Sequence, residues 1–190
     1  MIKILHKRFG SAAVLLLLFS ALAMPARADQ KDPRLFGLFK ELLQTKDSAK
    51  GGKVARRIWA IWYSHSSKEI IEMIRDGDTL MQRRAFAMAE KTFTEIITTD
   101  PTYAEGWNRR ATVRFFSGNY LGSISDIKET LVREPRHFGA LSGLGLVYIR
   151  LKRYRKAIKA FEAALKVNPH MPQVRRNIER LKHLIKASEI

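Results

Sequence analysis

The sequence contains no cysteine, and only six prolines and eleven glycines among its 190 residues. Without cysteine there is no disulfide framework, no thiolate metal site, no cysteine nucleophile and no lipid-modified cysteine. Stability must therefore come from packing, for which a hydrophobic content of 46% suffices at this length. The composition indicates one domain or one short repeat array.

Recognised enzyme motifs are also missing. The histidines after residue 28 are far apart and lie in neither an H-E-x-x-H nor a paired-carboxylate context; they are His65, His137, His170 and His183. The stretch "SAKGGK" lacks the preceding strand and the spacing of a phosphate-binding loop. No nucleic-acid motif or interleaved aromatic pattern accompanies the basic residues. We therefore expect no catalysis, no cofactor, no metal site and no nucleic-acid partner.

The first 28 residues differ from the rest of the chain. Three basic residues precede the apolar run "SAAVLLLLFSALA", and Ala26 and Ala28 follow in the spacing that signal peptidases accept. We expect residues 1–28 to be a cleaved signal peptide that directs export. The alternative is an uncleaved membrane anchor, but this needs about 20 apolar residues, and the run here is shorter and ends at Pro25.

The chain remains strongly basic after such a cleavage. Its net charge falls from +17 to +13, because the first 28 residues hold four basic and no acidic residues. An exported protein does not meet cytosolic nucleic acid. The charge then suits an anionic membrane or envelope surface, an acidic protein partner, or solubility alone.

A repeat is visible in the proline positions. Pro101, Pro135 and Pro169 recur at intervals of 34 residues, each after an acidic or amide residue. Because proline is excluded from helix interiors, the three mark the ends of helix–turn–helix units of fixed length.

The unit at residues 138–171 has the most regular pattern. Small and large residues fall at the spacing W-x2-L-G-x2-Y in its first half and continue in its second half: Leu141, Leu144, Gly145, Tyr148, Ala157, Phe161 and Ala164. This stretch resembles a tetratricopeptide repeat. The resemblance implies an all-α fold, an α-solenoid of stacked helical hairpins curved around a groove.

Two preceding units follow the same offsets. Residues 104–137 carry Trp107, Ala111 and Gly118, although Arg110 and Arg114 replace the usual apolar and aromatic residues. Residues 70–103 form a further repeat, which keeps the following matching positions: Gly77, Phe86, Ala89, Phe93 and Pro101.

Two flanking segments complete the expected array. Residues 29–69 resemble a degenerate fourth hairpin, with Trp59 and Trp62 as bulky residues and Ser67 where the proline is missing. Residues 172–190 have apolar positions at helical spacing. A capping helix is favoured there over a partner-binding helix, since a repeat stack exposes an apolar face at its end.

The resemblance also implies a partner-binding groove lined by the first helix of each unit. The predicted groove residues are Glu105, Asn108, Arg109, Thr112, Phe116, Ser142, Leu146 and Arg150. Asn108 and Arg109 can hydrogen-bond a peptide backbone or carboxylate. The alternative is that these are solvated positions without a role. A chaperone-type carboxylate clamp is not supported, because Ile74, Asp78, Gly139 and Gly143 occupy the corresponding faces.

A second candidate surface lies in the C-terminal third, where twelve basic residues face two acidic ones between Arg150 and Lys186. Arg153, Lys156, Arg176 and Arg180 represent it. This surface can bind an anionic membrane or an acidic partner, or remain an ordinary solvated exterior.

The sequence thus predicts a non-catalytic adaptor or scaffold of the periplasm that binds a peptide or helix of a partner protein in its groove. The main alternative is a peripheral protein held to the envelope membrane by its basic surface. Self-association by stacking of terminal hairpins is a third alternative.

Overall fold

The computed structural model describes residues 32–187, and within that range the chain forms nine helices and no strand. The predicted signal peptide, residues 1–28, lies outside the described residues. The helices are α1 (Arg34–Gln44), α2 (Ser48–Tyr63), α3 (Lys68–Gln82), α4 (Phe86–Thr99), α5 (Ala104–Phe116), α6 (Tyr120–Arg133), α7 (Phe138–Arg150), α8 (Tyr154–Val167) and α9 (Pro172–Ala187).

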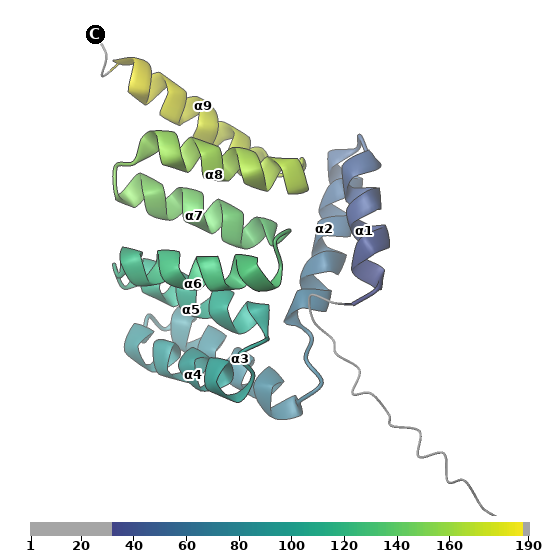
Figure 1. Cartoon of the computed structure of the whole chain (residues 1–190), viewed down its shortest axis with the longest axis vertical. Coiled ribbons are helices and arrows are strands. Elements are labelled where there is room, and N and C mark those ends of the chain that lie inside the picture. Colours follow the sequence, from purple (N-terminus) through teal and green to yellow (C-terminus); the bar gives the residue numbers. More distant parts are fainter. Residues whose placement is uncertain (1–31, 188–190) are drawn as a thin grey trace, which may run out of the picture.

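Helices α3 to α8 form three stacked antiparallel hairpins, as the 34-residue period predicted (Figure 1). The predicted all-α solenoid is therefore confirmed. Inside the hairpins, small residues let the two helices approach closely. A Cβ atom at Gly77 would overlap the ring of Phe93, and one at Gly145 would overlap the ring of Phe161. These glycines are required by packing between helices.

The turns inside the three hairpins also repeat with the same period. Arg84, Gly118 and Lys152 have positive φ angles of 59°, 85° and 55°. They stand 34 residues apart, and each ends its hairpin's first helix in the left-handed conformation that closes such turns. Only Gly118 adopts this conformation without steric cost.

Helix α9 covers the last hairpin. It buries Val174, Ile178 and Leu181 against a cluster that includes Ala157 and Phe161 of α8. The apolar end of the stack is thereby removed from water.

The N-terminal hairpin has a position that the repeat pattern did not predict. Residues 29–69 were expected to be a degenerate repeat, and the structure does place the two helices α1 and α2 there. They do not continue the stack beyond α3. They run beside the array, crosswise to its helices, along the edge where one repeat passes into the next (Figure 1). We call this hairpin, Arg34–Tyr63, the strap.

The strap contacts the same position in three successive inter-repeat turns. Tyr103 donates its hydroxyl to the Tyr63 carbonyl at 3.2 Å, and the His137 ring stacks on Trp62 with centroids 4.1 Å apart. Met171 packs against the strap's apolar cluster. Because residues 103, 137 and 171 are 34 apart, one hairpin holds three repeat junctions at once.

Candidate functional site

A hollow lies between the first helices of the second and third repeats. It has a volume of about 110 Å³ and is lined mainly by apolar groups of α5, α6 and α7. Its floor includes Ile127 and Ser123, and the Ser123 hydroxyl donates to the Ala111 carbonyl at 2.8 Å. Since that polar group is already bonded, the floor offers apolar contact.

Two large apolar side chains at the rim of the hollow are open to solvent. Phe116 of α5 is 58% exposed, and Leu146 of α7 is 40% exposed. Both were predicted groove residues. Thr112 also lines the hollow, although its hydroxyl is bonded to the Asn108 carbonyl at 2.9 Å. Asn108 lines the hollow as well, so four predicted groove residues are brought together there.

The two glycines of α7 that face this region differ in their surroundings. A Cβ atom at Gly143 would meet only Ile127 Cδ1, at 3.9 Å, so the space above Gly143 is part of the hollow. A Cβ at Gly139 would overlap the indole of Trp59 from the strap. The strap therefore covers the hollow's flank at Gly139 and leaves it open at Gly143.

Three other predicted groove residues belong to an interior polar network. Glu105 is 1% exposed, so it does not present its side chain to a partner. Asn108 is 8% exposed and also lines the hollow. Glu105 accepts hydrogen bonds from Asn108 Nδ2 at 3.1 Å and from Arg109 Nε at 2.8 Å. Arg109 also reaches Asp78 Oδ1 of α3 at 3.1 Å and lies over the Tyr63 ring, 4.2 Å from its centroid.

His137 completes this network. Its Nδ1 accepts the backbone N–H of Ala140 at 3.0 Å, so the ring proton resides on Nε2, which donates to Glu105 Oε2 at 3.1 Å. The network joins α3, α5, α7 and the strap. Asn108 and Arg109 already donate to carboxylates inside the fold, so the expectation that they hydrogen-bond a peptide stays a prediction.

Burial governs the ionisation of this network. Burial raises the pKa of Glu105, and the hydrogen bonds from His137 and Asn108 oppose that rise. Burial and then the nearby Glu105 carboxylate raise the pKa of Asp78 to about 6, although Arg109 lies beside it. Burial lowers the pKa of Arg109 to about 10. The hydrogen bonds of this network hold α3, α5 and the start of α7 together.

The departures from the repeat pattern at Arg110 and Arg114 form a second ion network. Arg110 donates two hydrogen bonds to the Asp126 carboxylate of α6, of 3.0 and 2.9 Å. Arg114 bonds the same carboxylate at 2.9 Å and Glu90 of α4 at 2.7 Å. The bonds to Asp126 hold the second repeat's own two helices together, and the bond to Glu90 joins that repeat to the first, a structural role that the sequence pattern alone did not indicate.

The remaining predicted groove residues lie away from the hollow. Ser142 donates to the Gly139 carbonyl of its own helix at 2.9 Å. Arg150, at the end of α7, donates from Nε to the Tyr120 hydroxyl at 2.9 Å and is exposed. Neither lines the hollow.

The four residues chosen for the basic surface are all exposed. Arg153 and Lys156 lie at the start of α8, and Arg176 and Arg180 lie on α9. Arg176 donates to Gln173 Oε1 at 2.7 Å on its own helix. They face solvent at the end of the array opposite α3.

Metal binding and membrane spanning find no support in the part of the chain that the structure describes. In residues 32–187 no three histidine, aspartate or glutamate side chains gather as a metal ion would need. None of the helices there has the length and apolar content needed to cross a bilayer.

The contribution of Trp59 was missed by sequence reasoning. It was assigned to repeat packing, but it covers Gly139 and contacts the Phe138 ring, with centroids 5.7 Å apart. The missing proline at Ser67 was the one signal that residues 29–69 depart from the repeat geometry.

Comparison with known proteins agrees with this architecture. The tetratricopeptide repeat model matches residues 139–171. A TPR repeat-containing protein of Rhizobium etli is 37% identical over 136 residues, which is 72% of this chain and 67% of that protein.

Solved structures of tetratricopeptide domains have the same fold. The Sgt2 TPR domain from Aspergillus fumigatus has a TM-score of 0.61 at 22% identity, covering 65% of this chain and 83% of that domain. The first TPR domain of Spaghetti (RPAP3), bound to an HSP90 peptide, has a TM-score of 0.60 at 17% identity. The match covers 63% of this chain and 95% of that domain.

Proposed function

Because the chain belongs to the tetratricopeptide repeat proteins, we propose that it is a non-catalytic interaction module that binds a segment of a partner protein between α5 and α7. The observation that carries this proposal is the apolar hollow with Phe116 and Leu146 exposed at its rim. Exposed large apolar side chains beside a concave apolar surface are typical of protein-binding sites.

The chemistry of the hollow favours an apolar anchor in the partner. The first TPR domain of Spaghetti (RPAP3) is bound to an HSP90 peptide, which supports a peptide-binding role for this fold. Here Asn108 donates to Glu105, and Arg109 donates to Glu105 and Asp78, so part of their hydrogen-bonding capacity is already used inside the fold. The partner is therefore a peptide or helix that inserts a bulky apolar side chain between Phe116 and Leu146.

The proposed site of action is the bacterial periplasm. Support comes from the sequence of residues 1–28, with its basic start, apolar run and A-x-A spacing. The partner is accordingly an envelope protein.

Photocrosslinking in intact cells tests the groove. A photoreactive residue at Thr112, which lines the hollow, should capture one abundant envelope protein that mass spectrometry can identify. Changing Phe116 and Leu146 together to Ser should reduce this capture by roughly tenfold or more, since each lost apolar anchor removes about 1–3 kcal/mol of burial.

The matched control is the pair Leu121→Ser and Val132→Ser on α6. These side chains are 70% and 76% exposed and do not line the hollow, so capture should remain at the parent level. Equal capture by the Phe116/Leu146 variant and the control would show that the partner does not use the hollow.

A further inference from the structure

The positive charge of the protein is concentrated at one end of the array. Residues 68–149, which span α3 to nearly the end of α7, contain eleven basic and eleven acidic residues. Residues 150–187, which include α8 and α9, contain twelve basic and two acidic residues. With Glu189 counted, residues 150–190 have a net charge of +9, so the array is electrically balanced over most of its length and strongly positive at its C-terminal end.

The two parts also use their cations differently. In the balanced part, Arg109, Arg110 and Arg114 are only 12–20% exposed and bond to carboxylates of neighbouring helices. In the C-terminal part, Glu162 and Glu179 are the only carboxylates among residues 150–187, and Glu179 accepts Lys182 at 3.2 Å. Even with Glu189, three carboxylates cannot neutralise twelve cations, so this end of the molecule keeps a large net positive charge.

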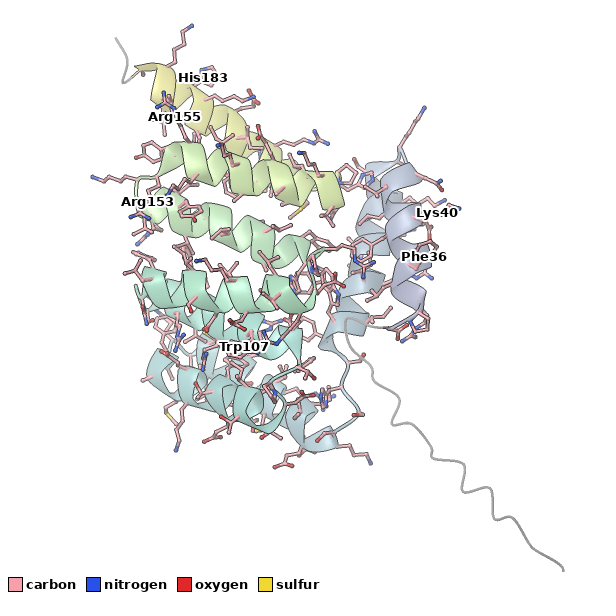
Figure 2. All side chains as sticks on the ribbon, viewed as in Figure 1. Phe36, Lys40, Trp107, Arg153, Arg155 and His183 are labelled. Carbon is pink, nitrogen blue, oxygen red and sulfur yellow. The ribbon has the colours of Figure 1, made fainter. Side chains whose placement is uncertain are left out.

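All twelve cations are exposed. Helix α9 turns Val174, Ile178 and Leu181 inward onto α8, which leaves its basic residues on the outer side. Figure 2 shows Arg153 and Arg155 from the start of α8 and His183 of α9 extending from the same end of the molecule. Leu184, 46% exposed, lies among the cations of α9.

We propose that this basic end, formed by α8 and α9, docks on a membrane surface that contains anionic phospholipids. Charge complementarity is the main argument, since each Lys or Arg near such a surface strengthens binding by roughly fivefold, the equivalent of about 1 kcal/mol. The 16 residues of α9 present cations along a helix roughly 24 Å long, which suits an extended surface rather than a single bound ion.

Other polyanions fit this end less well. Single-stranded nucleic acid needs exposed aromatic side chains for base stacking, but Phe161 is buried and Tyr154 is half-buried. Exposed Leu184 within the basic surface can enter the headgroup region of a bilayer, as the apolar side chains of interfacial helices do. The hollow between α5 and α7 is not part of this surface, so the proposal does not depend on groove binding.

Vesicle co-sedimentation tests the proposal. Residues 29–190 are used, so that the predicted signal peptide cannot itself insert into the bilayer. The protein should sediment with vesicles of phosphatidylglycerol and phosphatidylcholine at low salt but not with phosphatidylcholine alone. Binding should weaken strongly when the ionic strength rises from about 0.05 to about 0.5 M.

A charge-reversal variant locates the surface. Changing Arg153, Lys156, Arg176 and Arg180 to Glu should weaken binding by roughly a hundredfold or more, given the fivefold contribution of each cation. A matched control changes four exposed basic residues of the balanced part to Glu: Lys68, Arg75, Arg83 and Lys128. It has the same net charge as the first variant but should bind nearly as well as the parent.

Two results would overturn the proposal. The parent could fail to sediment with anionic vesicles at low salt, and retention of poly-glutamate in that case would assign the surface to an acidic protein. Alternatively, the two variants could lose binding equally, in which case net charge alone is responsible. Circular dichroism must first show that both variants have the parent's helicity.

Discussion

Two glycines in α7 have opposite roles although they are two residues apart. A Cβ atom at Gly143 would enter the hollow with one ordinary contact, to Ile127 Cδ1 at 3.9 Å. A Cβ atom at Gly145 would overlap the Phe161 ring, which is fully buried. The same substitution at these two positions therefore separates a glycine that lines a surface hollow from one that packs a core.

The expected results for alanine differ in sign. Gly143→Ala should stabilise the protein by about 0.5–1 kcal/mol, because alanine loses less backbone entropy in a helix. Gly145→Ala should destabilise it by about 1–3 kcal/mol, because Phe161 must move. Urea unfolding of both variants measures this difference, and equal stabilities would contradict the packing described for α7 and α8.

The ionisation of Asp78 should make the stability of the protein depend on pH. Burial and Glu105 raise its folded-state pKa to about 6, above the ordinary value of about 3.9. The folded state therefore holds this proton more tightly, so Asp78 contributes stability at low pH that is lost as pH rises through about 6. In Asp78→Asn, this pH-dependent loss is absent.

The stability of the Asn variant relative to the parent should accordingly increase between about pH 4.5 and 7. Thermal unfolding of both proteins across this range gives the comparison. A constant difference would mean that Arg109, 3.1 Å from the carboxylate, keeps the pKa of Asp78 at its ordinary value.

At the scale of elements, the strap is a hairpin that lies beside the repeat stack rather than within it. Trp62 is its central contact: it is 2% exposed, stacks on His137 and packs against Phe39 and Phe138. Its Nε1 is buried without a hydrogen-bond partner among the described residues. The indole therefore contributes through packing and aromatic contact, and its N–H carries a desolvation cost.

Trp62→Ala should lower the free energy of unfolding by about 3–5 kcal/mol and weaken the contacts of the strap with the three turns. Trp62→Phe keeps a ring without the unpaired N–H and should cost much less. Hydrogen exchange of α1 and α2 should accelerate in the alanine variant before that of α8. If α1 and α2 stayed as protected as α8, the strap would not be held by this contact.

At the scale of the whole molecule, the strap changes how a repeat array behaves. In a simple solenoid each repeat contacts only its neighbours, and unfolding can begin at any weak unit. Here Tyr103, His137 and Met171 all contact one hairpin, and His170 Nε2 donates to the Leu42 carbonyl, 128 residues earlier in the chain, at 3.1 Å. These contacts tie the three repeats together and set the junctions beside the hollow.

Much of the fold could be predicted because repeats are local. Helix positions, turn positions and the small residues Gly77 and Gly145 follow from a 34-residue period and from packing within one hairpin. The candidate site was predicted less well. Phe116, Leu146, Thr112 and Asn108 do meet at a hollow, whereas Glu105 is inside the protein.

The difference has a physical reason. The sequence by itself determined the repeat unit, the balance of charge along the chain and the absence of cysteine chemistry, since each depends on residue identity or short spacing. Only the tertiary structure decided which polar groups are bonded to one another. Arg109 donates to Asp78, which is 31 residues earlier in the chain, and Glu105 bonds to His137, which is 32 residues later. It also decided where the strap lies, because that follows from burying Trp62 against turns that lie far along the chain.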